Sequence, residues 1–92
     1  MASKADPWNE PQIVKADVIA LQHVAAGKGS ELHQKRVIDL LINKLAATYD
    51  LSFRPEEHGG ERATAFAEGK RFVGLQVVKL LKADPTHYSK ED

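Results

Sequence analysis

The sequence predicts an all-α fold, a small domain of three helices over residues 10–26, 30–50 and 61–83. Apolar residues recur three and four positions apart within each range, which is the spacing that gives a helix one apolar face. Glycine and proline, which interrupt helices, gather in the two segments between these ranges. With 92 residues, the chain is long enough for one such domain and too short for two.

The first helix is expected to begin at Asn9, which would act as its N-cap. Gln12 follows three residues later, where the partner residue of a capping box stands. Trp8 and Ile13 can close a hydrophobic staple around the same turn. Gly27 ends the helix, because glycine readily adopts the left-handed conformation that follows a helix C-terminus.

The second helix is expected to begin after Ser30, whose hydroxyl can accept a hydrogen bond from a free backbone N–H group. Glu31 and Lys35 are four residues apart and of opposite charge, so they can pair on one edge of this helix. Its apolar face comprises Val37, Ile38, Leu41, Ile42, Leu45, Ala46 and Tyr49. Pro55 and the glycines of "DLSFRPEEHGG" then interrupt the helical pattern.

The third helix contains two interior glycines, Gly69 and Gly74, although glycine costs roughly 1 kcal/mol there relative to alanine. On a helical wheel they fall on opposite shoulders of an apolar stripe to which Phe66 belongs. We interpret all three residues as close-packing positions. The third helix is then central, wedged between the other two helices or between one of them and another chain. The alternative is that glycine is merely tolerated at these positions.

The chain is expected to fold as a single helical domain over residues 9–84. A flexible arm, residues 1–8, precedes the domain, and a polar tail, residues 85–92, follows it. The boundary before the tail is marked by Pro85, because the residue that precedes a proline avoids the helical conformation.

Four apolar residues lie on the wrong side of their helices for a single core. They are Ile19, Leu40, Phe72 and Leu75. A single exposed apolar residue needs no explanation, whereas four on three helices indicate contact with another protein. These four residues are therefore the candidate interface.

Two basic pairs, Lys35-Arg36 and Lys70-Arg71, could form a small positive patch that binds phosphates. Carboxylates within about one helical turn of them would partly neutralise such a patch, so nucleic-acid binding is the alternative rather than the leading hypothesis. Lys70 also lies within the apolar stripe of its helix. It either extends past the end of the core or pairs with Asp17, which intrudes on the apolar face of the first helix.

Composition excludes several kinds of chemistry. Thirteen basic and thirteen acidic residues give no net charge, so no long-range attraction to a polyanion is expected. The absence of cysteine excludes disulfides and thiolate metal sites. The start of the chain has no apolar segment of a signal peptide, and no apolar run approaches the roughly 20 residues that span a bilayer. We expect a protein that is made in a cytoplasm and has no membrane contact.

No motif indicates catalysis or a cofactor. The "GKGS" segment lacks the spacing of a phosphate-binding loop and follows a helix, where that loop requires a strand. The four histidines form no pair at metal-binding spacing. A chain of this size has little room for a ligand pocket. We therefore expect no enzyme, no metal, no cofactor and no small-molecule substrate.

A basic pair opens an apolar helix in "KRVIDLLINKL", a phenylalanine-containing loop follows in "DLSFRPEE", and the next helix contains "ATAFAEGKRFVGLQVVKLL". This arrangement, over residues 35–83, resembles the Bbp-nineteen-like family of small tailed-bacteriophage proteins. The residues that match the family's pattern are Thr64, Ala65, Phe66, Glu68, Gly69, Arg71, Val73, Gly74 and Leu75. The chain departs from that pattern at Gln34, where the family has glycine, and in "AATYD", which lacks one.

The resemblance implies a phage-encoded structural or assembly accessory protein of the virion, with no catalytic residues. Its partners would be other virion proteins or copies of itself, in an oligomer. Phe66, Gly69, Arg71 and Gly74 would be the signature positions. Two alternatives remain open: a small DNA-binding accessory protein that uses the two basic pairs, and a phage protein that binds a host factor.

Overall fold

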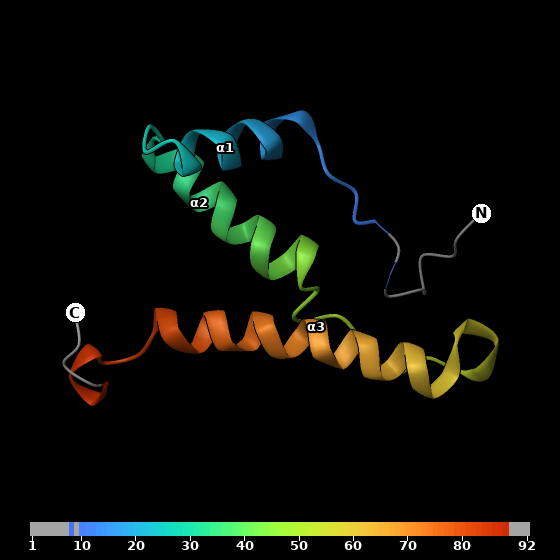
Figure 1. Cartoon of the computed structure of the whole chain (residues 1–92). Helices are drawn as coiled ribbons and strands as arrows, with labels where there is room; N and C mark the ends of the chain where they lie inside the picture. Colours follow the sequence, from blue (N-terminus) through green and yellow to red (C-terminus); the bar gives the residue numbers. More distant parts are fainter. Residues whose placement is uncertain (1–7, 9, 89–92) are drawn as a thin grey trace.

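The computed structural model describes residue 8 and residues 10–88, which contain three α-helices and no strand (Figure 1). The helices are α1 (Lys15–Ala25), α2 (Glu31–Asp39) and α3 (Gly60–Leu81). A π-helix, η1 (Leu40–Leu45), continues α2, and two short 3-10 turns, η2 (Glu56–His58) and η3 (Pro85–His87), flank α3. The predicted all-α, three-helix fold is confirmed.

The continuous rod of α2 and η1 is the middle element of the fold. It packs against α1 at one end and against α3 at the other, and α3 lies along one edge (Figure 1). The expectation that the third helix is central is therefore wrong. The rod is central because it has buried residues both in α2 and in η1. The three buried residues of α3 all lie on one side of that helix.

The first helix begins later than predicted. Residues 10–14 are not helical, and Val14 is the N-cap residue of α1. The Asp17 carboxylate accepts a hydrogen bond from the Val14 backbone N–H at 3.2 Å, so it supplies the partner that the sequence analysis assigned to Gln12. The expected cap, Asn9, lies outside the described residues. Trp8 packs edge-on against Phe66, with ring centroids 6.0 Å apart.

The turn between α1 and α2 has the predicted chemistry. Gly27 adopts a left-handed conformation with φ of 75°, and the Lys28 N–H donates to the His23 carbonyl at 2.8 Å. Ser30 caps α2, since its hydroxyl accepts from the His33 N–H at 3.1 Å. The His33 imidazole in turn accepts from the Ser30 N–H at 3.2 Å, which completes a capping box with histidine in the usual place of glutamate.

The second helical rod ends five residues before the predicted end at residue 50. The π-helical segment stops at Leu45, and Ala47 has a left-handed backbone with φ of 49°. Thr48 closes the end of the rod, because its N–H and its hydroxyl both donate to the Ile42 carbonyl, at 3.0 and 2.7 Å. Tyr49, predicted on the apolar face, is consequently exposed.

The third helix starts and ends within two residues of the prediction. Gly59, with φ of 99°, leads into α3 from η2, and the helix ends at Leu81. The Asp84 carboxylate accepts the Thr86 N–H at 3.0 Å and so caps η3. The described part of the expected tail, residues 85–88, contains that 3-10 turn, and residues 89–92 lie outside the description, as do residues 1–7 of the expected arm.

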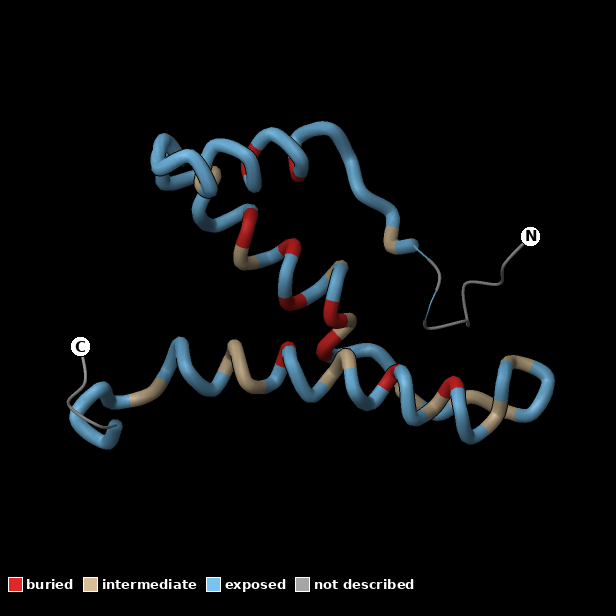
Figure 2. Tube along the Cα trace, viewed as in Figure 1, coloured by how far each residue is buried: buried red, intermediate tan, exposed pale blue. Residues whose placement is uncertain are grey.

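The chain has a small core and a large surface. Its buried apolar residues lie where the helices face one another (Figure 2). They are Ala20, Val37, Leu40, Ile42, Ala46, Ala63 and Ala67. The accessible surface is 7252 Å², whereas a compact monomer of this 10.2 kDa mass exposes about 5,300 Å². The chain is also thin, with extents of 45 × 35 × 17 Å, so it exposes much apolar surface.

Candidate protein-interaction site

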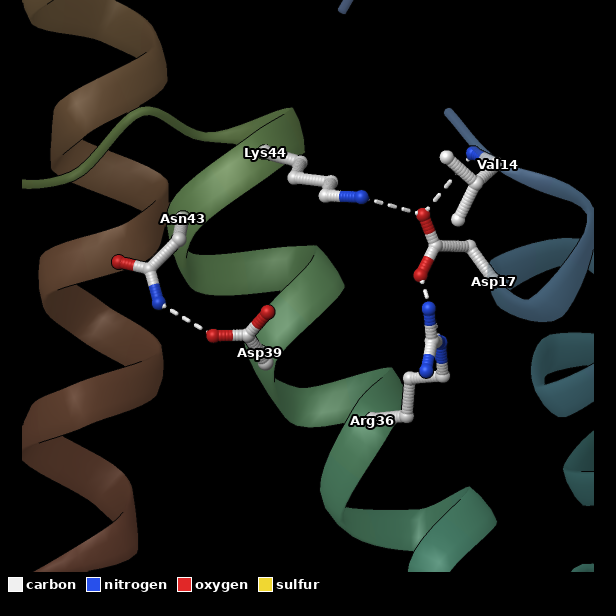
Figure 3. A network of polar contacts seen from close by, with 6 residues as sticks. All are labelled: Val14, Asp17, Arg36, Asp39, Asn43 and Lys44. Atoms are coloured by element: carbon white, nitrogen blue, oxygen red, sulfur yellow. Dashed lines mark hydrogen bonds and ion pairs between the residues drawn. The ribbon is translucent and has the colours of Figure 1, made fainter. Parts of the chain in front are cut away.

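A buried carboxylate fixes α1 against the central rod (Figure 3). Asp17 is only 3% exposed, and its two oxygens accept from Arg36 Nε at 2.9 Å and from Lys44 Nζ at 2.6 Å. The pKa of Asp17 is lowered from 3.8 to about 2. The main cause is the hydrogen bond from Lys44, and the next is the hydrogen bond from the Val14 N–H. Asp17 therefore pairs with Arg36 and Lys44, and the pair with Lys70 considered from the sequence is not formed.

A second junction joins the end of η1 to α3 at Gly74. A Cβ built on Gly74 would overlap the Thr48 hydroxyl and lie 2.9 Å from the Cβ of Ala46. Thr48 is fully buried. The predicted close approach at Gly74 is thus confirmed, and its neighbours, Ala46 and Thr48, directly follow the π-helical segment.

Arg71 reinforces this junction from the adjacent turn of α3. Its Nε donates to the Thr48 carbonyl at 2.9 Å, and its Nη1 binds Glu68 Oε2 at 2.6 Å. The pKa of Glu68 is lowered, first by a hydrogen bond with the Ser52 hydroxyl and then by Arg71. Arg71 therefore makes the charge contact expected of it, although within the chain.

An apolar groove of about 260 Å³ opens beside this junction, between η1 and α3. We call it the η1–α3 groove. Its lining consists of Leu41, Leu45, Ala46, Lys70, Val73, Gly74 and Val77. The side chains of Leu41, Leu45 and Val73 are exposed although they are apolar. Burial lowers the pKa of Lys70, the one ionisable residue in the lining.

Two of the predicted close-packing residues are placed differently. A Cβ on Gly69 would meet no atom of another element within 4 Å, so no part of the described chain approaches there, and close packing of Gly69 against another chain stays a prediction. Phe66 is about half exposed rather than a core anchor, and the Lys70 ammonium lies 5.9 Å from its ring centroid. Gly69 and Phe66 do not lie on the side of α3 that packs on η1. Of the three predicted close-packing residues, only Gly74 lies on that side.

Three of the four candidate interface residues are exposed. Phe72 is 61% exposed, and Ile19 and Leu75 are also accessible. Leu40, by contrast, is 3% exposed and belongs to the core, so its assignment to the interface is wrong. Leu40 is buried because the central rod has neighbours on two sides and therefore needs apolar residues outside a single stripe.

Three of the four basic residues that could bind phosphate pair with carboxylates of the chain itself. Lys35 lies 3.3 Å from Glu31, as the helical spacing predicts. Arg36 binds Asp17, and Arg71 binds Glu68. Lys70 lines the η1–α3 groove.

Two of the four histidines meet at the turn between α1 and α2. The rings of His23 and His33 contact edge to face, with centroids 4.7 Å apart. Over residue 8 and residues 10–88, no three histidine, cysteine, aspartate or glutamate side chains gather so as to hold a metal ion. None of the helices in the described part of the chain has both the length and the apolar content needed to cross a bilayer.

Comparison of the chain with protein-family models, with curated proteins and with solved structures found no match. The function of the site is therefore inferred from its geometry.

The residues that line the η1–α3 groove were predicted on apolar helix faces, but as parts of a closed core rather than of an open groove. A signal was present on α3, where Phe66, Lys70, Val73, Val77 and Leu80 follow one another at alternating intervals of four and three residues. Such alternation is typical of a seam between two helices. Thr48 carried no comparable signal, because a threonine at the end of a helical pattern is usually a surface residue.

Proposed function

We propose that this chain is a non-catalytic structural or assembly accessory protein of a tailed-phage particle, which acts through helix-mediated contacts with other proteins of the particle or with copies of itself. The observation that carries the proposal is the amount of apolar side chain that the folded chain leaves exposed. The phage setting is supported by the resemblance of residues 35–83 to the Bbp-nineteen-like family.

Exposed apolar side chains occur on all three helices and on the adjoining loops. They include Ile13, Val18, Ile19, Leu21, Leu41, Leu45, Leu51, Phe53, Phe72, Val73, Leu75, Leu80 and Leu81. Full burial of one such side chain contributes about 1.5–3 kcal/mol. So many exposed apolar side chains on one small chain indicate a protein that functions inside a larger assembly.

The DNA-binding alternative has less support. It requires Lys35, Arg36, Lys70 and Arg71 to be available to phosphates. Three of them make ion pairs within the chain, and zero net charge provides no field to attract a polyanion. The host-factor alternative shares the apolar surface, so it must be separated by experiment.

The proposal is tested by supplying tagged chain during infection by the phage that encodes it and measuring the tag in purified particles. We expect the chain in the particles, and we expect Phe72→Glu with Leu75→Glu to lower its incorporation at least about tenfold, since each lost burial exceeds 1.4 kcal/mol. The control is Leu32→Glu, at a side chain that is 77% exposed in the first turn of α2.

Absence of the chain from purified particles would overturn the virion role and favour the host-factor alternative. Equal incorporation of the double variant and the Leu32 control would overturn the assignment of the outer face of α3 as a contact.

A further inference from the structure

The surface of α3 that borders the η1–α3 groove has the pattern of a helix-pairing seam. Phe66, Lys70, Val73, Val77 and Leu80 follow one another at alternating intervals of four and three residues, and we call them the α3 seam. This interval keeps residues on one line along a helix and lets a second helix pack along it. Lys70, Val73 and Val77 of the seam line the groove.

Within the described part of the chain, Trp8 packs edge-on against Phe66 at the N-terminal end of the seam, and no other helix lies along the seam. α3 packs on η1 and η2, and its closest junction with η1 is at Gly74. Val73 is 59% exposed, and beyond the junction Leu80 and the adjacent Leu81 are similarly exposed. Figure 2 shows that the C-terminal half of α3 is mostly exposed or intermediate along its length.

We propose that a second copy of this chain covers the seam, with the C-terminal half of its α3 lying antiparallel in the η1–α3 groove. By two-fold symmetry each copy fills the groove of the other. η1 and α3 of both copies would then surround one apolar core, as in a four-helix bundle. The inference rests on the proposed function, that of a protein acting through helix contacts, and deepens it by naming the partner.

Charge determines the direction of the pair. Two parallel α3 helices in register would place Lys70 against Lys70, and like charges at facing positions repel. In the antiparallel arrangement Val73 faces Val77 of the second copy. Leu80 then packs on the aliphatic part of the second copy's Lys70, and the two Lys70 ammonium groups lie apart.

The area that needs covering also fits a dimer. The chain exposes about 1,900 Å² more than a compact monomer of its mass, a total that includes polar surface and the chain ends, and burial of about half of that area on each copy gives about 2,000 Å² for two copies. Obligate homodimer interfaces bury roughly 2,000–5,000 Å² in total. Zero net charge removes the long-range repulsion between identical chains.

Sedimentation equilibrium of the full chain over a range of concentrations tests the proposal. We expect a species of twice the 10.2 kDa chain mass. Val77→Glu should raise the Kd of that dimer at least about a hundredfold, because each dimer would bury two unpaired carboxylates. Phe72→Glu, on the far side of the same helix, should leave the Kd within about twofold.

Disulfide trapping tests the direction of the helices without relying on a destabilised variant, because the chain has no native cysteine. Val73→Cys and Val77→Cys chains, one of them tagged, are mixed and oxidised. We expect the mixed Val73–Val77 pair to form faster than either self-pair. Lys79→Cys, on the far side of α3, is the control and should cross-link slowly.

A monomer at all concentrations, an assembly other than a dimer, or an unchanged Kd for Val77→Glu would overturn the proposal, as would faster linkage of the self-pairs. These results are distinct from failure of the proposed function. If the wild-type chain is a monomer and Val77→Glu is excluded from particles, a different virion protein occupies the groove. If the chain is a dimer but is absent from particles, only the virion role is refuted.

Discussion

Gly74 of α3 lies against Thr48 so closely that any side chain on Gly74 would overlap the Thr48 hydroxyl. Thr48 cannot easily yield, because it is fully buried and its hydroxyl donates to the Ile42 carbonyl at 2.7 Å. The missing side chain is therefore what allows α3 to reach the end of the central rod. The relationship joins residues 26 positions apart and explains a glycine in a helix interior.

Gly74→Ala should lower the free energy of unfolding by about 2 kcal/mol. Overpacking of a closed site costs up to about 3 kcal/mol, and the better helix propensity of alanine offsets about 1 kcal/mol of it. Urea denaturation followed by circular dichroism at a fixed protein concentration measures the change. Equal or higher stability of the variant would show that α3 does not depend on this contact.

Gly69→Ala should have the opposite effect and raise the free energy of unfolding by about 0.5–1 kcal/mol. A Cβ at residue 69 meets nothing within 4 Å, so only the helix propensity changes. The same denaturation measurement applies, and this variant is the matched control for Gly74 on the same helix. A loss of stability here would mean that a partner approaches Gly69 closely.

Ala47→Gly should raise the free energy of unfolding by about 0.5–1 kcal/mol. Ala47 has φ of 49°, a left-handed conformation that costs an alanine roughly 1–2 kcal/mol, and the greater backbone entropy of unfolded glycine offsets part of the gain. Thermal melts provide the readout. Ala46→Gly is the control and should destabilise, since Ala46 is buried with a right-handed backbone.

Asp17→Asn should reduce the loss of folding stability that occurs as the pH falls below about 4. The pKa of Asp17 in the folded chain is about 2, below its ordinary 3.8, so its ionised form stabilises the fold above about pH 4. That contribution is lost as pH falls from about 4 through 2. The wild-type chain should therefore lose more stability than the Asn variant over this interval.

Melting temperatures at pH 7, 4, 3 and 2 for both chains test this prediction. Glu68 and Asp84, whose pKa values are also lowered, titrate in both chains and cancel in the comparison. Parallel curves for the two chains would contradict the assignment of the acid-sensitive group to Asp17.

The sequence predicted the features that depend on local chemistry. Gly27 and Ser30 shape the turn between α1 and α2 as expected, because left-handed glycines and hydroxyl caps act within a few residues. Gly74 was also predicted as a close contact. Its neighbour was not, because which surface approaches a bare position depends on the tertiary arrangement.

The errors have a common cause in the central rod. The helical wheel assumed regular α-helix and one buried face, whereas the rod widens into a π-helix after Asp39 and has neighbours on two sides. Leu40 was consequently placed on the outside. The start of α1 was predicted too early for a different reason. Gln12 and Asp17 can both cap a helix, but only Asp17 also binds Arg36 and Lys44 of the rod.

The π-helical segment also sets the orientation of everything that follows it. An α-helix turns by about 100° and advances about 1.5 Å per residue, so deleting one residue from Leu40–Leu45 to restore a regular helix would swing the remaining chain by that angle. Thr48 would then face away from Gly74. The widened coil thus acts as a spacer, and the relative placement of the two halves of the molecule depends on a single extra amino acid.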